Sequence, residues 1–235
     1  MSKKVLFPAV VLVIICSAFI TAQYYARQMK DTYLTSYTYM DFESDPNEKF
    51  EVKMSKYGLS NTLKSYENVP VGMGEERDKS TKCMGLTASF KRRAYNWLEI
   101  IPKDVKPFRG HVKRISCWVW GPHVAYKMDY ILQDYQGYYW TLNVGNLYYK
   151  GWKNIHTPVP PTIPQEEAQL PRRRGLKFKK FRLTSNPKER ADKLHVFFDT
   201  LKVVADTYRD LYDGWELEEQ LKEEQYGDLI KEENK

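Results

Sequence analysis

The sequence predicts an all-β protein, an antiparallel β-sandwich followed by a C-terminal helix. Short segments of alternating apolar and polar residues recur between turn signals about every ten residues, which is typical of sandwiches. The 18 Tyr, 10 Phe and 6 Trp favour strands over helices. Strands do not alternate with helical segments, and no period of about 20–50 residues indicates a solenoid or a propeller. A chain of 235 residues is long enough for one such sandwich.

The N-terminus has the pattern of a secretory signal peptide. Lys3 and Lys4 form a basic n-region, residues 5–20 are almost continuously apolar, and a small-residue exit follows. We therefore expect residues 1–22 to be cleaved off, so that the mature chain begins near Gln23. The cleaved protein would lie outside the cytoplasm, without stable membrane insertion.

Two alternatives to cleavage stay open. The apolar stretch of about 16 residues is not far below the roughly 20 needed to span a bilayer, so an uncleaved anchor is one of them. Lipidation at Cys16 is the other, although the bulky Ile15 stands where lipoprotein signals usually have a small residue. Pro8 and the polar, aromatic run after Ala22 favour cleavage.

After the signal, the sequence divides into a lead-in over 23–36, a sandwich domain over 37–205 and an acidic helical tail over 206–235. Residues 55–82 are polar with scattered glycines and predict a long loop with at most one short strand. The strands are expected, in order, at 37–43, 50–54, 85–90, 97–101, 111–120, 125–132, 138–144, 152–159, 178–184 and 194–201. Five prolines between 158 and 171 predict a stiff crossing without a strand.

Residues 111–160 are the aromatic centre of the predicted sandwich. In the strand 111–120, Trp118 and Trp120 share one face, while Ile115, Cys117 and Val119 share the other. Exposed aromatic residues could stack on sugar rings or form the centre of a protein interface. The alternative is that they fill the core, and we expect about half to do so. The predicted structural aromatic core comprises Trp118, Trp120, Trp140 and Trp152.

Two cysteines remain after cleavage, Cys83 and Cys117. In an oxidising compartment they could form one disulfide, which would close a loop of about 34 residues and stabilise the fold by about 3 kcal/mol. The equally open alternative is two buried free thiols, because Cys117 lies in a strongly apolar strand. No Cys or His pair has the spacing of a zinc site.

The sequence contains no motif of a known catalytic constellation, so we predict no enzyme, no catalytic residue, no cofactor and no metal. There is no Gly-x-Ser-x-Gly elbow, no His-Glu-x-x-His and no phosphate-binding glycine loop. Asp41 and Glu43 lie two apart on an expected strand and could form a paired carboxylate, with a structural-ion or edge role. The net charge of +7 does not predict nucleic-acid binding, because the chain is exported and carries no nucleic-acid motif.

Charge is divided between two parts of the chain. Residues 150–190 hold eleven Lys and Arg against three Glu, and residues 216–235 hold eight acidic residues against three basic ones. Tyr208, Leu211, Tyr212 and Trp215 precede the acidic run at the spacing of one helix face. Opposite charges on one exported domain indicate self-association or docking on another protein, and an ordinary solvated surface is the alternative.

Several short motifs resemble the spirochaete flagellar filament outer-layer (sheath) protein family, FlaA. The similarity extends over about 38–205 and implies a jelly-roll or galactose-binding-like sandwich. The motifs are Asp41-Phe42-Glu43, Ile115-Ser116-Cys117-Trp118-Val119-Trp120-Gly121, Tyr130-Ile131-Leu132-Gln133-Asp134 with Gly137, Gly151-Trp152-Lys153-Asn154-Ile155, Val159-Pro160, Ile163-Pro164-Gln165, Leu176-Lys177-Phe178 and an apolar strand ending in Asp199. The chain looks most like the shorter of the two sheath paralogues of Leptospira-type spirochaetes, although the acidic tail is not part of the family pattern.

The resemblance implies a non-enzymatic coat subunit in the periplasm. Such a subunit surrounds the core flagellin of a periplasmic flagellum, together with other sheath proteins that include a longer paralogue, and stiffens the filament for motility. We predict that a basic cluster contacts flagellin or a neighbouring coat subunit and that the tail is the complementary element. The predicted interface comprises Arg172, Arg173, Arg174, Lys177, Lys179, Lys180, Arg182, Tyr208, Tyr212 and Trp215. The alternative function is a periplasmic carbohydrate-binding module that recognises glycan or peptidoglycan.

Overall fold

The computed structural model describes residues 34–74, 80–165 and 175–207. Within them the chain forms two antiparallel sheets and one short helix, α2 (Pro46–Lys49). The strands are β1 (Leu34–Met40), β2 (Phe50–Met54), β3 (Gly58–Tyr66), β4 (Cys83–Phe90), β5 (Trp97–Pro102), β6 (His111–Pro122), β7 (Tyr126–Gln133), β8 (Tyr139–Asn146), β9 (Lys150–Pro158), β10 (Lys177–Ser185) and β11 (Leu194–Asp206).

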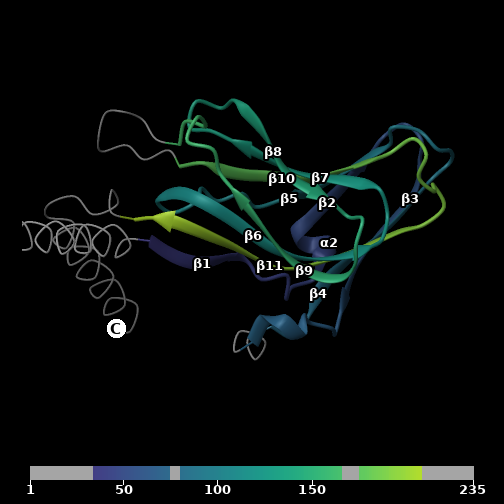
Figure 1. Ribbon diagram of the computed structural model, residues 1–235, viewed down its shortest axis with the longest axis horizontal. Coiled ribbons are helices and arrows are strands. Elements are labelled where there is room, and N and C mark those ends of the chain that lie inside the picture. Colours follow the sequence, from purple (N-terminus) through teal and green to yellow (C-terminus); the bar gives the residue numbers. More distant parts are fainter. Residues whose placement is uncertain (1–33, 75–79, 166–174, 208–235) are drawn as a thin grey trace, which may run out of the picture. The chain divides into compact units, whose positions relative to one another are not determined.

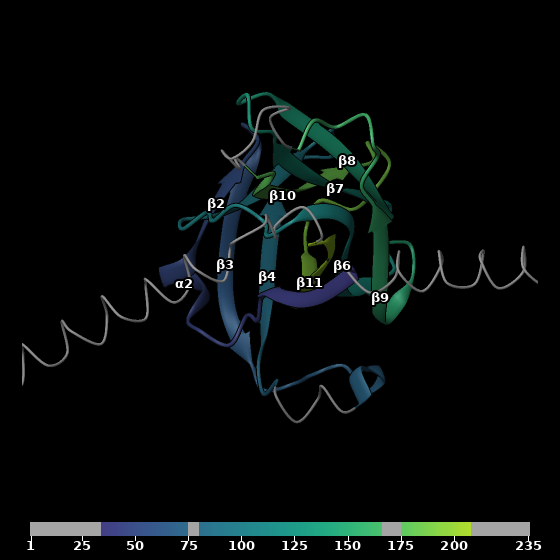
Figure 2. The same ribbon diagram turned by 90° about the vertical axis from the view of Figure 1, so that its left-hand side faces the viewer.

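The two sheets lie face to face. The six-stranded sheet has the order β3-β4-β11-β6-β9, with β1 paired to β11, and the five-stranded sheet has the order β2-β5-β10-β7-β8. Figure 1 shows the two layers, and Figure 2 shows β2 and β3 at one side of the sandwich with β8 and β9 at the other. The predicted antiparallel sandwich is therefore confirmed. The predicted C-terminal helix lies outside the described residues.

The core fills the space between the sheets. Strands β6 and β11 of one sheet, and β7 and β10 of the other, each direct alternate apolar residues inward, as the period of two in a strand requires. Phe181 of β10 lies 5.1 Å from Phe198 of β11 and 4.7 Å from Phe178, measured between ring centroids. Burying each of these fully enclosed rings stabilises the fold by about 2–3 kcal/mol.

Most predicted strands appear within a few residues of their expected positions. The exception is β3, which spans nine residues inside the segment expected to be a loop. It lies at the edge of its sheet, and Leu63 is its one buried residue, so its sequence shows no apolar alternation. Between β1 and β2, Asp45 caps the start of α2, and its side chain accepts a hydrogen bond from the Asn47 backbone N–H at 2.9 Å.

The proline-rich segment after β9 packs against the sandwich through residues 159–165, which include two of the family-like motifs. Val159 and Ile163 are buried in the core. The Gln165 amide donates to the backbone oxygen of Val112 at 2.9 Å and accepts from the Val112 N–H at 2.7 Å. Residues 159–165 are therefore packed against the sandwich.

The predicted signal peptide, 1–22, lies outside the described residues, as do most of the lead-in and nearly all of the tail. Among the residues that are described, no helix is long and apolar enough to cross a membrane.

Candidate functional site

The outward face of the six-stranded sheet carries a cluster of aromatic side chains from four strands. Cys117 and Val119 of β6 are fully buried, so the alternate residues Trp118 and Trp120 face outward. Trp120 lies opposite Phe197 of β11 on one side and opposite Trp152 of β9 on the other. The strand register therefore brings these three rings into one row.

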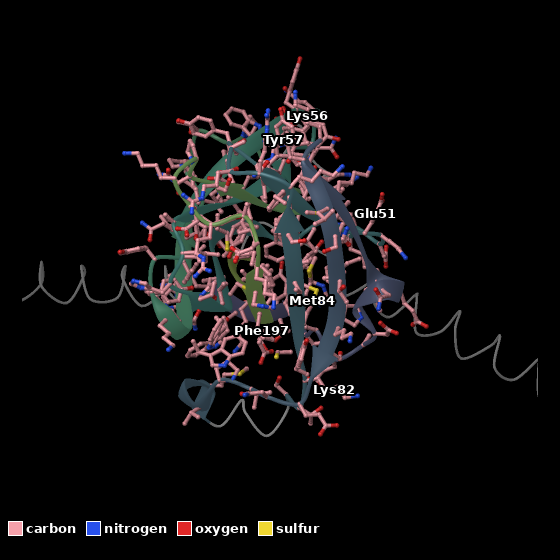
Figure 3. All side chains as sticks on the ribbon, turned by 90° about the vertical axis from the view of Figure 1, so that its right-hand side faces the viewer. Glu51, Lys56, Tyr57, Lys82, Met84 and Phe197 are labelled. Carbon is pink, nitrogen blue, oxygen red and sulfur yellow. The ribbon has the colours of Figure 1, made fainter. Side chains whose placement is uncertain are left out.

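Phe197 is at the centre of this aromatic cluster. Its ring centroid lies 5.3 Å from that of Trp120, 6.5 Å from that of Trp152 and 5.2 Å from that of Tyr66 at the end of β3. Figure 3 shows Phe197 toward the end of the sheet where Lys82 lies, far from Lys56 and Tyr57 at the other end. We call Tyr66, Trp120, Trp152 and Phe197 the aromatic cluster.

The structure corrects the prediction that Trp118, Trp120 and Trp152 fill the core. All three are only half-buried and lie outside the set of buried core residues. Trp140 is also half-buried, but it packs against the core, and its indole N–H donates to Asp134 Oδ2 at 2.8 Å. The alternation of β6 was assigned correctly from the sequence. Both faces of that strand are apolar, so the pattern alone could not say which face turns inward.

The aromatic cluster surrounds a hollow of about 270 Å³ that also touches Asn68 and the buried Cys83. Gly85 lies beneath it, because a Cβ at this position would be 2.4 Å from the Tyr66 ring and 2.9 Å from the Phe197 ring. Tyr66 retains 40% of its exposure. The result is an open apolar recess on an otherwise polar sheet surface, which is the kind of feature that marks a binding site.

Trp118 is covered by the segment that joins β3 to β4. A Cβ on Gly72 would lie 2.8 Å from Trp118 Cη2, so the backbone passes directly over the indole. The nearby Met73 is buried, whereas Val71 keeps 76% of its exposure. Trp118 is therefore part of a packed layer beside the open recess.

Glu43 forms hydrogen bonds with residues 80–82, at the end of the connection that leads into β4. Its carboxylate accepts hydrogen bonds from Ser80 Oγ at 3.0 Å, Thr81 N at 2.8 Å, Thr81 Oγ1 at 2.6 Å and Lys82 N at 3.2 Å. Partial burial works to raise the pKa of Glu43, but the bonds from Thr81, Lys82 and Ser80 outweigh it and lower that pKa. The sequence suggested that Asp41 and Glu43 share a strand face. That is wrong, because β1 ends at Met40.

A second carboxylate, Asp199, is fully buried next to Glu43. Ser80 Oγ donates to Asp199 Oδ1 at 3.2 Å and Thr200 Oγ1 donates to the same oxygen at 2.9 Å. Burial raises the pKa of Asp199 to about 6, the charge of Glu43 adds to the rise, and the bonds from Thr200 and Ser80 oppose it. Thr200 has a φ of 38° at a bulge in β11, a backbone conformation that non-glycine residues rarely adopt.

Cys83 and Cys117 are both buried free thiols, which is the second of the two alternatives open from the sequence. Cys83 lies on β4 and Cys117 on β6, and β11 runs between these strands. Two strand spacings are about 10 Å, whereas a disulfide requires Cα atoms less than about 7 Å apart. Burial raises the pKa of Cys83 to about 12, and the charge of Asp199 contributes.

The outward face of the five-stranded sheet is chemically different. The Glu99 carboxylate accepts from Lys180 Nζ at 2.8 Å and from Arg182 Nε and Nη2 at 2.8 and 2.6 Å. Burial works to raise the pKa of Glu99, and the bonds and charges of these two cations lower it. Asp129 on the next strand pairs with Lys127 at 3.0 Å. We call these side chains the ion-pair ladder.

The ion-pair ladder leaves the predicted basic interface less positive charge than the sequence suggests. Lys180 and Arg182 share the single negative charge of Glu99 within the molecule, while Lys177 and Lys179 are half-buried. The remaining predicted interface residues, Arg172, Arg173, Arg174, Tyr208, Tyr212 and Trp215, lie outside the described residues. Sequence reasoning missed Glu99 because its partners are more than 80 residues away, on a strand whose pairing the sequence does not show.

The side chains of the aromatic cluster are suited to van der Waals contact and ring stacking. In the described part of the chain, no three His, Cys, Asp or Glu side chains are grouped so as to hold a metal ion. Aromatic rings around an apolar recess can enclose an apolar side chain of a partner or stack on a flat ring.

The fold and the site together define a β-sandwich protein with an aromatic cluster around an open hollow on one sheet. The chain belongs to the FlaA family of flagellar filament outer layer proteins, whose family model matches residues 19–212. The resemblance inferred from the sequence motifs is thereby confirmed.

Individual relatives are distant. A flagellar filament outer layer-like protein of Brachyspira hyodysenteriae is 24% identical over 180 residues, which cover 76% of this chain and 82% of the relative. Among solved structures, the chain is similar to a family 11 carbohydrate-binding module of Clostridium thermocellum, with 10% identity, a TM-score of 0.44 and coverage of 73% of this chain and 95% of the module. It is also similar to a family 29 carbohydrate-binding module, with 10% identity, a TM-score of 0.40 and coverage of 77% and 97%.

Proposed function

We propose that this protein is a structural sheath subunit of the periplasmic flagellar filament. It is exported with the signal peptide 1–22 removed, packs on the flagellin core beside other sheath proteins, and stiffens the filament for motility. The observation that carries this proposal is the family match, because residues 19–212 enclose every strand of the sandwich. No catalytic step is part of the proposed role.

The aromatic cluster supports a role in assembly. Tyr and Trp are enriched at the centres of protein interfaces, where a few such residues provide most of the binding free energy. A sandwich held rigid by two sheets fixes the relative positions of Trp120, Trp152 and Phe197 before any partner arrives, so less entropy is lost on binding. We therefore assign filament contact to this face in place of Lys180 and Arg182.

Peptide mass spectrometry of purified periplasmic flagella tests the proposal. Peptides from the chain should be enriched in the flagellar fraction, at an abundance comparable with other coat proteins, and should begin near Gln23. A protein found in the periplasm but absent from washed flagella would contradict the sheath role.

Carbohydrate binding is the second candidate, and the outward aromatic cluster is the observation that favours it. Exposed Trp and Tyr rings stack on sugar rings, and the hollow of about 270 Å³ would accommodate part of one. A peptidoglycan pull-down and a glycan array distinguish the two candidates. Specific retention that is lost in Trp120→Ala would favour the carbohydrate-binding module.

A further inference from the structure

We propose that the aromatic cluster, with the lysines beside it, receives the acidic C-terminal segment 208–233 of a second copy of this chain. The inference rests on the proposed function as a sheath subunit and adds to it a partner and a surface. It also replaces the basic cluster around residues 172–182 as the complement of the tail.

The receiving surface combines apolar rings with positive charge. Lys64 lies on β3 opposite Gly85, in the same row as Phe197, and Lys150 precedes Trp152 by two residues on β9. Both lysines are exposed, and neither forms an ion pair with a described residue. The strands of this sheet contain two acidic residues: Asp199, which is buried, and Asp206, which lies at the far end of β11.

The sequence of the C-terminal segment matches this surface. Tyr208, Leu211, Tyr212 and Trp215 provide apolar side chains at the spacing of one helix face. The following residues, 216–235, carry eight acidic residues against three basic ones. An aromatic side chain seated in the hollow would bring the carboxylates at 216–219 toward Lys64 and Lys150.

Geometry favours a second copy over the tail of the same chain. Asp206 lies nine residues beyond Phe197 along β11, which is about 30 Å at the rise of a strand. Tyr212 follows Asp206 by six residues, and a fully extended chain of that length spans at most about 20 Å. Tyr208, Leu211 and Tyr212 therefore cannot reach the hollow of their own molecule. Trp215, nine residues beyond Asp206, would reach it only in a fully extended chain, because nine helical residues span about 14 Å.

A contact of this kind uses different surfaces on the two partners. The tail of one molecule meets the sheet of the next, so the contact is heterologous and leaves a free tail and a free hollow at the two ends. Such contacts propagate into open rows, which suits a repeating outer layer on a filament.

Isotope-mixed cross-linking of the full-length protein tests the inference. Equal amounts of normal and heavy-isotope-labelled protein are mixed and treated with a zero-length carbodiimide, which joins lysine amines to carboxylates. The expected products are mixed-isotope peptides that link Lys64 or Lys150 to Glu216, Glu218 or Glu219. Lys53 and Lys127, on the outward face of the other sheet, serve as internal controls that should not link to the C-terminal segment.

Matched variants identify the groups responsible. Tyr212→Ala with Trp215→Ala should lower the mixed-isotope links about tenfold, equal to about 1.4 kcal/mol of binding, whereas Tyr226→Ala in the same segment should not. Lys64→Glu with Lys150→Glu should abolish association, and combining it with Glu218→Lys and Glu219→Lys should restore it. Rescue by the charge exchange excludes misfolding as the cause of the loss.

Other outcomes overturn the inference. Links confined to same-isotope pairs would place the tail on its own molecule, and links to Lys53, Lys127 or Lys177 would place it on a different surface. Links from Lys64 or Lys150 to core flagellin in isolated flagella, or protection of the cluster by glycan, would assign the hollow to another occupant. If the protein is present in flagella and lacks these links, the inference fails alone. If it is absent from flagella, the proposed function fails.

Discussion

The two outward faces of the sandwich use the same strand geometry for opposite purposes. On the five-stranded sheet, the buried carboxylates Glu99 and Asp129 are matched by Lys180, Arg182 and Lys127 in the ion-pair ladder. On the six-stranded sheet, the corresponding outward positions carry a row of aromatic rings. One face therefore pairs its buried acids with cations, and the other places an aromatic cluster around an open hollow.

This difference indicates which face is available to a partner. A partner that binds on the ion-pair ladder would remove water from the charged side chains of the ladder, and these side chains offer little apolar surface in return. A partner that covers the aromatic cluster buries apolar surface, which contributes a favourable free energy of about 25 cal/mol per Å². The comparison predicts that changes in the ladder alter folding stability, whereas changes in the cluster alter association.

The largest stability effect should come from removing the centre of the ladder. Glu99→Ala leaves Lys180 and Arg182 without their shared carboxylate, and we expect a loss of about 2–3 kcal/mol of unfolding free energy, because both cations are partly exposed and can recover some hydration. Urea denaturation measures it. Glu51→Ala, which breaks an exposed pair with Lys53, is the control and should cost less than about 0.5 kcal/mol.

The buried carboxylate of Asp199 should make the unfolding free energy depend on pH, with an effect similar to or smaller than that of Glu99→Ala. The pKa of Asp199 is raised to about 6 in the folded state from the ordinary 3.8, so the native state holds its proton more tightly. Between about pH 4 and pH 6 the unfolding free energy of the wild type should therefore fall by about 2–3 kcal/mol relative to Asp199→Asn as pH rises.

The pKa of Glu43 is shifted in the opposite direction, so Glu43 affects stability below about pH 4.5, at the lower edge of that window. Its pKa is lowered, so its contribution is present above the unfolded pKa near 4.5 and is lost as pH falls through the folded value. Urea denaturation of wild type and Asp199→Asn over this pH range isolates Asp199. Parallel pH profiles for the two proteins would show that the Asp199 carboxylate is not perturbed.

Filling the floor of the hollow should have a moderate effect. In Gly85→Ala the new Cβ would overlap the rings of Tyr66 and Phe197, so the cluster must open, and we expect a loss of about 1–2 kcal/mol. Near-ultraviolet circular dichroism reports the accompanying ring movement. Thr87→Ala, at the next outward position of β4, should leave the aromatic signal unchanged.

The thiols should give the smallest effect. Because β11 separates Cys83 from Cys117, a reducing agent should leave the thermal midpoint unchanged, and alkylation should modify both cysteines only after unfolding. A midpoint that falls by several degrees on reduction would instead indicate a disulfide.

The sequence was informative about strands and poor at assigning the surfaces they create. Alternation and turn residues located most strands, and the motifs around Trp152 and Gln165 identified the family. The outward position of Trp118 and Trp120 was not predictable, because Cys117 and Val119 on the opposite face are equally apolar. The face of β6 that belongs to the core is set by the packing of the second sheet, which the sequence of one strand does not show.

The ion-pair ladder and the hydrogen bonds of Glu43 could not be predicted from the sequence for a related reason. Glu99 meets Arg182, and Glu43 meets Ser80, through contacts between residues far apart in the sequence. Counting charges over 150–190 therefore suggested a free basic surface, although two of its cations, Lys180 and Arg182, share the carboxylate of Glu99 on another strand. The edge strand β3 was missed because an exposed edge lacks the apolar pattern that marks a buried strand.

One measurement tests most directly the claim that the aromatic face joins the filament and the ladder face does not. Two matched pairs of substitutions are introduced into the full-length protein. One pair is Trp120→Ala with Trp152→Ala in the aromatic cluster, and the other is Trp97→Ala with Tyr139→Ala, two exposed aromatic residues on strands β5 and β8 of the five-stranded sheet. Each variant is quantified in purified flagella by mass spectrometry. We predict that the first pair lowers the flagellar fraction at least about tenfold while the periplasmic amount is kept, and that the second pair has no effect. Equal retention of both variants, or selective loss of the second, would contradict the account.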